Sequence, residues 1–197
     1  MARYRKENKP NKELDIADFQ KRIEDSKLTL RKKAYAILLY WIGCRRTELL
    51  EIDEEKYKPC KSLRKESVKE ENGFLLISNL VAKKGGHRAE TISLPLTLYG
   101  MDIVKEVWQR TKSGKLLFPF QTSTAYRIIK TLYPDKYPHW MRYNRNTKIR
   151  RQIDGKTFSL DDAKAFTGIR SDRTMQTYGM TTNEGAKRVG AVLKDME

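Results

Sequence analysis

Five residues of this chain could together carry out phosphoryl transfer: Arg45, Lys84, His139, Arg142 and Tyr178. A tyrosine hydroxyl can act as a covalent nucleophile. Two guanidinium groups can hold phosphate oxygens in bidentate fashion and stabilise the negative charge that develops on them. A lysine and a histidine can transfer the protons. The set therefore predicts attack on a phosphodiester by a chemistry that uses no metal ion and no other cofactor.

The first arginine lies at the start of a predicted helix and the lysine at a predicted hairpin tip, each close to a glycine. Arg45 follows Gly43, which is expected to end an apolar helix, and Glu48 comes three residues later, where it can brace the guanidinium. Lys84 precedes a Gly-Gly pair that predicts a hairpin tip. Taken singly, both cations have the ordinary sequence context of solvated surface residues.

The histidine and the second arginine are three residues apart on a predicted helix. His139 and Arg142 therefore share one face of that helix and can reach one anion. The helix continues through several basic residues, so we expect it to contact phosphates, as we do for the hairpin tip. The predicted DNA contacts are Lys83, Arg88, Arg145, Lys148 and Arg150.

Charge is the strongest compositional signal. The 197 residues include 41 Lys and Arg against 25 Asp and Glu, a formal net charge of +16. This charge predicts a polyanionic partner, first nucleic acid and second an anionic membrane surface. The longest apolar run, residues 34–43, is about half a membrane span, so no membrane partner is expected. Residues 1–13 are predicted to be a flexible basic arm, and residues 14–197 one domain.

The cysteines and histidines are too few for a disulfide framework or a metal site. Cys44 and Cys60, with two histidines in the chain, match no metal-ligand spacing. No signal-peptide pattern opens the sequence. We therefore expect a reduced, cytoplasmic, DNA-associated protein without metal or cofactor.

Hydrophobic periodicity predicts an α+β fold that is mostly helical, with a small antiparallel sheet near the middle. The predicted helices are 14–25, 28–43, 46–52, 101–110, 122–132, 138–151, 159–168, 172–178 and 183–194. The predicted strands are 73–78, 80–83 and 90–94. Residues 53–71 are predicted to be irregular.

The order of these motifs resembles the catalytic domain of the tyrosine recombinases, the family of phage integrases and Xer-type resolvases. Residues 38–50 (LLYWIGCRRTELL) resemble its first-arginine motif, and residues 81–95 its lysine-bearing hairpin. Residues 139–142 match its His-x-x-Arg box, and residues 166–178 (FTGIRSDRTMQTY) resemble the segment that ends at its nucleophilic tyrosine. The resemblance extends from about residue 14 to the end of the chain, and implies the family's catalytic-domain fold.

The resemblance also implies roles. Arg45 and Arg142 would bind the scissile phosphate, and Tyr178 would attack it to give a 3′-phosphotyrosyl link. Lys84, or its neighbour Lys83, would protonate the departing 5′ oxygen.

Two supporting roles follow in the same way. His139 would serve acid–base chemistry near the nucleophile, and Glu48 would hold the first arginine in place.

The sequence departs from the family in two respects. Ile169 follows Gly168 where the family usually has a His or Trp that donates a hydrogen bond to the phosphate. Isoleucine has no donor, so this contact is either lost or supplied by Arg170 or a backbone amide. The family's N-terminal core-binding domain also has no counterpart before residue 14, so we expect a minimal recombinase or the catalytic fragment of a longer one.

The function implied is that of a site-specific recombinase or integrase of a mobile element, in keeping with an archaeal, viral or plasmid source. It would act on double-stranded DNA as a homo-oligomer, a dimer or a tetramer. Predicted helix 183–194 could dock on a neighbouring subunit or on its own core. The alternatives are a topoisomerase IB-like nicking and resealing enzyme, a non-catalytic DNA-binding module of the same fold, and a basic RNA-binding protein. The last explains the charge but not the order of the motifs.

Overall fold

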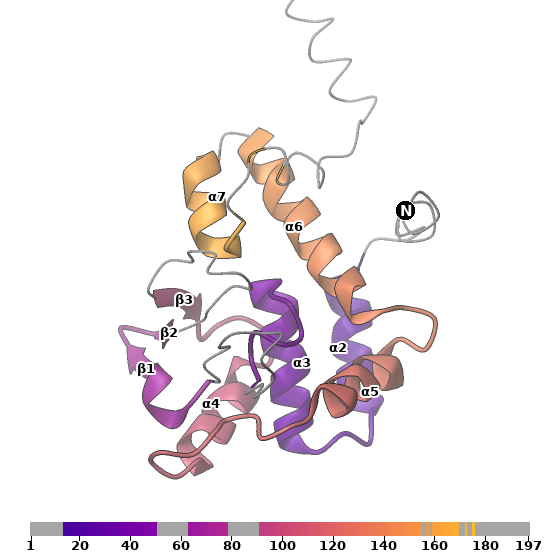
Figure 1. The fold of residues 1–197 in the computed structure, drawn as a ribbon, viewed down its shortest axis with the longest axis vertical. Coiled ribbons are helices and arrows are strands. Elements are labelled where there is room, and N and C mark those ends of the chain that lie inside the picture. Colours follow the sequence, from indigo (N-terminus) through magenta and orange to yellow (C-terminus); the bar gives the residue numbers. More distant parts are fainter. Residues whose placement is uncertain are drawn as a thin grey trace, which may run out of the picture.

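The computed structural model of the chain describes residues 14–50, 63–78, 91–154, 157, 159–169, 172 and 175. Six helices, a short 3-10 helix and a three-stranded sheet make up this part of the chain (Figure 1). The helices are α2 (Ile16–Asp25), α3 (Leu30–Ile42), α4 (Met101–Arg110), α5 (Thr122–Leu132), α6 (Pro138–Asp154) and α7 (Leu160–Thr167). The 3-10 helix is η2 (Lys65–Ser67), and the strands are β1 (Val68–Glu71), β2 (Phe74–Ser78) and β3 (Thr91–Pro95).

Helix α3 is the centre of the fold. Its residues from Ala34 to Tyr40, and Ile42, are buried, so it has no polar face along most of its length. It packs against α4, α5 and α6. The surrounding helices are amphipathic instead, as surface helices of a globular protein are. Helix α2, for example, buries only Phe19 and Ile23.

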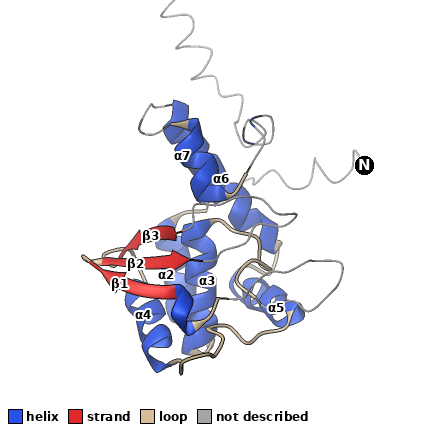
Figure 2. Ribbon diagram, turned by 60° about the vertical axis from the view of Figure 1, so that its left-hand side comes forward, coloured by secondary structure: helices blue, strands red, loops and turns tan. Residues whose placement is uncertain are grey.

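The sheet is antiparallel, in the order β1-β2-β3, and lies on one side of the helices (Figure 2). Strands β1 and β2 are joined by a tight turn in which Asn72 and Gly73 have φ values of 50° and 80°, as two-residue hairpin turns favour. Along β2, Leu75 and Ile77 are buried in the core, whereas Phe74 is exposed. This period of two is the alternation that a half-buried strand requires.

The structure confirms most of the predicted elements. Helices α4 and α5 have the predicted bounds, and α6 begins at Pro138 as predicted but runs on to Asp154. Helix α7 has the predicted capping box, in which the Ser159 hydroxyl oxygen accepts a hydrogen bond of 3.0 Å from the amide of Asp162. Its C-cap, Gly168, is left-handed with φ of 68°.

Two predictions were wrong. Residues 46–49 form turns rather than the start of a helix, with hydrogen bonds from Glu48 N to Arg45 O (2.9 Å) and from Leu50 N to Thr47 O (3.2 Å). The segment Val68–Glu71 is strand β1 rather than irregular chain. Three of its four residues are exposed, so it carries no hydrophobic alternation, and pairing with β2 holds it in place.

Several predictions lie outside the described residues. They are the basic arm at 1–13, strand 80–83 with the hairpin tip, and helix 183–194; of helix 172–178, the structure describes residues 172 and 175, both helical. In the described part of the chain, no helix is long and apolar enough to cross a membrane.

Helix α6 connects two cores. Its first half joins the main core through Met141, and its second half forms a smaller core with α7 and the residues that follow it. The buried members of this smaller core are Ile149, Ala163, Ile169 and Met175.

Candidate active site

Helix α3 ends in contact with α6. Its C-cap, Gly43, has a left-handed φ of 63°, and its amide donates a hydrogen bond to the Leu39 carbonyl oxygen. A Cβ atom at Gly43 would lie 2.8 Å from Cγ of Arg145 and 2.9 Å from its Cβ. The glycine therefore both ends α3 and leaves room for α6.

Two arginines of α6 bond to the last carbonyl groups of α3. Nη1 of Arg142 donates a 2.9 Å hydrogen bond to the Gly43 carbonyl oxygen, and Nε of Arg145 donates one of 2.9 Å to that of Trp41. The Arg145 guanidinium also lies over the Trp41 ring, 5.4 Å from its centroid. Carbonyl groups at a helix end have no partner within the helix, so these contacts satisfy them and position α6.

A buried carboxylate lies between the two predicted phosphate-binding arginines. Oε1 of Glu48 is 3.0 Å from Nη1 of Arg45 and 3.9 Å from Nη1 of Arg142. The side chain of Glu48 is 0% exposed and that of Arg142 2%, whereas 38% of the Arg45 side chain is exposed. Two positive charges against one negative charge leave this cluster positive.

The buried guanidinium keeps one N–H group unused. Nε of Arg142 has no hydrogen-bond acceptor among the described residues. A buried donor without an acceptor is unfavourable unless a ligand or water supplies one.

His139 lies in the first turn of α6, one turn before Arg142. Partial burial lowers the pKa of its imidazole below the usual value, and the positive charges of Arg142 and Arg45 lower it further. The side chain remains exposed to solvent. A neutral imidazole in contact with solvent can accept a proton at neutral pH.

The described fold has counterparts among solved structures. It is similar to the XerH site-specific recombinase bound to a palindromic difH substrate in a post-cleavage complex, with a TM-score of 0.67 and 15% identity over 95% of this chain and 54% of that chain. It is similar to the XerA recombinase, with a TM-score of 0.58 and 18% identity over 90% of this chain and 63% of that one. It is also similar to the Tn1549 transposon integrase in complex with circular intermediate DNA, with a TM-score of 0.58 and 16% identity over 94% of this chain and 68% of that one.

The chain has the tyrosine recombinase fold. It spans about half the length of the XerH chain. No protein-family model matches the sequence, and no curated protein matches it either.

Within this fold, the structure brings four of the predicted residues together: Arg45, Glu48, His139 and Arg142. Five other predicted residues lie outside the described part of the chain: Lys83, Lys84, Arg88, Arg170 and Tyr178. In the described ranges, no three His, Cys, Asp or Glu side chains gather into a group that could hold a metal ion.

Ile169, which is predicted to stand where the tyrosine recombinases usually have a His or Trp, is buried in the smaller core with Ile149 and Met175. Its amide donates a 3.3 Å hydrogen bond to the hydroxyl oxygen of Thr167. Both its side chain and its amide are therefore engaged within the protein.

The predicted DNA contacts on α6 make contacts within the protein. Arg145 bonds to α3, as described above, and Nζ of Lys148 donates a 2.8 Å hydrogen bond to the Leu14 carbonyl oxygen. Arg150 is half-buried on the same helix. DNA contact by these three residues remains a prediction.

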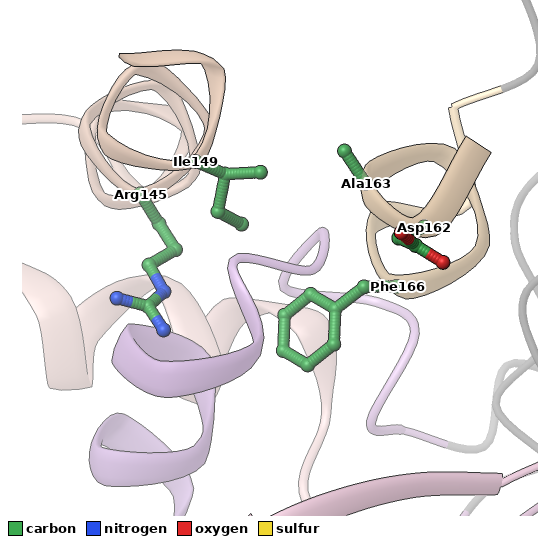
Figure 3. A pocket seen from close by; sticks show the side chains of 5 residues that line it. All are labelled: Arg145, Ile149, Asp162, Ala163 and Phe166. Atoms are coloured by element: carbon green, nitrogen blue, oxygen red, sulfur yellow. The ribbon is translucent and has the colours of Figure 1, made fainter. Parts of the chain in front are cut away.

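A pocket between α6 and α7 was not predicted. It has a volume of about 280 Å³ and is lined by Arg145, Ile149, Asp162, Ala163 and Phe166. Figure 3 shows the Phe166 ring and Ile149 directed into the gap, with Arg145 turned toward the end of α3. Apolar spacing on two separate helices could not show that they leave a space between them.

Proposed function

We propose that this chain is a site-specific DNA recombinase that cleaves and rejoins strands through a 3′-phosphotyrosyl intermediate. The observation that carries the proposal is that Arg45 and Arg142 share the buried carboxylate of Glu48, beside His139, in a tyrosine recombinase fold. Residues 14–197 would form the catalytic domain, and residues 1–13 a basic arm.

The proposed partner is double-stranded DNA. The net charge of +16 supports a polyanionic partner. The XerH and Tn1549 integrase structures that this fold resembles contain DNA, which supports the same choice. Exchange between two duplexes needs a nucleophile for each cleaved strand, so the working form would be a homo-oligomer on DNA.

In the proposed reaction, the scissile phosphate binds to Arg45 and Arg142. The Tyr178 oxygen forms a bond to phosphorus while the bond from phosphorus to the 5′ oxygen breaks. The phenolic proton passes to His139, and the departing 5′ oxygen takes a proton from Lys84. Attack by a 5′ hydroxyl on the phosphotyrosine then reforms a phosphodiester and releases the tyrosine, so no ATP is consumed.

The arginines suit this chemistry because they hold their protons. A tyrosine with the ordinary pKa of about 10 is mostly neutral at pH 7, so its attack on the phosphate needs a proton acceptor or a positive field. The positive cluster supplies the field, and the lowered pKa of His139 keeps its imidazole ready to accept a proton.

The proposal can be tested with a pool of nicked suicide duplexes whose central sequence is randomised. Wild-type protein should form covalent adducts, and sequencing the trapped DNA would identify the site. Tyr178→Phe should form none, and the matched control Tyr99→Phe, which removes a hydroxyl that donates to the Gln20 carbonyl oxygen, should form adducts as wild type does. Adduct yield should be the same with and without EDTA. Adducts that persist in Tyr178→Phe, or cleavage that depends on a divalent metal, would contradict the mechanism.

A non-catalytic DNA-binding module of this fold is the second candidate. It is favoured by the burial of Ile169 at a position where the family usually has a hydrogen-bond donor. Such a module would bind duplex DNA but give no adduct at any sequence in the pool.

A further inference from the structure

A strip of basic and aromatic side chains runs beside the candidate active site. We call it the basic–aromatic strip, and its members are Arg46, Tyr126, Lys130, Lys136 and Tyr137. They come from the turn after α3, from α5 and from the connection between α5 and α6. None of them belongs to the proposed catalytic set.

Cation–ring interactions link four members of the strip. The guanidinium carbon of Arg46 is 5.7 Å from the centroid of the Tyr126 ring. Nζ of Lys130 is 5.9 Å from the same centroid and 4.7 Å from that of the Tyr137 ring. It also donates a 2.7 Å hydrogen bond to the Pro134 carbonyl oxygen. One ammonium group, fixed by a backbone contact, therefore joins two aromatic rings.

Both ends of the strip adjoin the site. Arg46 directly follows Arg45, and Tyr137 precedes His139 by two residues. Tyr137 is 57% exposed, more than any other large hydrophobic side chain in the described ranges. Much of its ring is therefore open to solvent although a cation lies close to it.

The charge of the strip is positive. Lys136 is half-buried, with Nζ 5.7 Å from the Trp140 ring, and adds a third cation to Arg46 and Lys130. The connection between α5 and α6 carries one carboxylate, the exposed Asp135. Three cations against one carboxylate favour a polyanionic ligand.

We propose that the basic–aromatic strip binds unpaired nucleotides of a DNA strand, with a base stacked on Tyr137 and phosphates near Lys130, Lys136 and Arg46. Exposed aromatic rings flanked by cations are the means by which proteins bind single strands without reading their sequence. A paired base inside a duplex presents no free face to such a ring. The inference rests on the proposed function, because cleavage and strand exchange free bases from their pairs beside the scissile phosphate.

The test compares binding of a labelled oligothymidylate of about ten nucleotides with binding of a duplex, by fluorescence anisotropy on the full chain at one salt concentration. Tyr137→Ala should bind the single strand roughly five- to a hundredfold more weakly. It should bind the duplex within about twofold of wild type, because duplex affinity comes chiefly from phosphate contacts. Tyr137→Phe keeps the ring and should restore single-strand binding.

The matched control is Phe74→Ala, which removes the other exposed large aromatic ring, on the sheet. It should leave both affinities unchanged. Lys130→Gln should flatten the salt dependence of single-strand binding by about one phosphate contact.

Wild-type single-strand affinity in Tyr137→Ala, or an equal loss for single strand and duplex, would overturn this inference. Neither result would affect the proposed function, which depends on adduct formation through Tyr178. Adduct formation can fail while Tyr137→Ala selectively loses the single strand, and in that case the strip stands and the recombinase proposal falls.

Discussion

Nη1 of Arg142 donates a 2.9 Å hydrogen bond to the carbonyl oxygen of Gly43, 99 residues earlier in the chain. The same nitrogen lies 3.9 Å from Oε1 of Glu48. One buried atom therefore connects the end of α3, the turn that carries Arg45, and the first half of α6. Changes that move the Gly43 carbonyl should consequently change the site as well as the fold.

Glu48→Gln should destabilise the protein by about 3 kcal/mol, because removing one partner of a buried ion pair leaves the other charge uncompensated. Adduct formation should slow as the two guanidiniums lose the negative charge that lies between them. The matched control is Glu70→Gln, which removes a carboxylate that is 34% exposed and pairs with Lys105. It should cost less than about 1 kcal/mol. Urea denaturation measures both free energies of unfolding, and equal losses in the two variants would contradict the account.

Gly43→Ala should cost more stability than Gly73→Ala. Both glycines have positive φ, 63° and 80°, so both substitutions carry a backbone cost of about 1–2 kcal/mol. Only at Gly43 would the new Cβ lie within 3.0 Å of another side chain, that of Arg145; at Gly73 nothing lies within 4 Å. This crowding should add about 1–3 kcal/mol to the loss of stability in Gly43→Ala.

Thermal unfolding and the rate of adduct formation should be measured for both glycine variants. Gly43→Ala should also slow cleavage, because its carbonyl holds Arg142, whereas Gly73→Ala should cleave at the wild-type rate. A Gly43→Ala variant as active as Gly73→Ala would show that this carbonyl contact does not position the arginine.

Arg142→Lys keeps the charge but loses the planar fork that reaches the Gly43 carbonyl and, in the proposed reaction, would reach the phosphate as well. Cleavage in a single-turnover assay should slow by roughly a hundred- to a thousandfold, the cost typical of one lost transition-state donor. Duplex affinity should change little. Arg127→Lys, at an exposed position on α5, is the control and should have no effect. Retention of full activity by Arg142→Lys would mean that charge alone suffices at this position.

The pKa of His139 predicts a pH dependence of stability. Burial and the charges of Arg142 and Arg45 lower its pKa in the folded protein below the value of about 6.5 that is expected in the unfolded chain. Between the folded and unfolded pKa values, the folded state therefore binds fewer protons than the unfolded state. The contribution of neutral His139 to the free energy of unfolding is present above the unfolded pKa and is lost as pH falls through the folded pKa.

Urea midpoints measured from about pH 7.5 to about pH 5 should fall more steeply for wild type than for His139→Gln. His87→Gln, which removes the second of the two histidines, is the control and should retain the wild-type slope. Identical slopes for wild type and His139→Gln would show that this imidazole is not perturbed.

The sequence was sufficient to predict the bounds of elements whose local signals agree. Helix α7 has a capping box at its start and a glycine at its end, and its bounds follow from them. Strand β1 has no such signal, because VKEE is charged and its pairing with β2 is a non-local interaction. The turns at 46–49 likewise follow from packing, since Glu48 must be buried between two arginines rather than lie along a solvated helix.

In the candidate site too, local spacing could be predicted and long-range contacts could not. The spacing of His139 and Arg142 predicts a shared helical face, which the structure has. That Arg142 bonds to Gly43 depends on elements 99 residues apart in sequence, and no local pattern encodes it.

The most direct test of the central claim is mass spectrometry of the covalent protein–DNA adduct after digestion with nuclease and trypsin. Cleavage after Arg173 and Lys187 gives the peptide TMQTYGMTTNEGAK, in which Tyr178 is the sole tyrosine. The account predicts that the nucleotide mass is attached to this peptide, through a 3′ phosphate on Tyr178. Attachment to a different peptide, or to a 5′ phosphate, would contradict it.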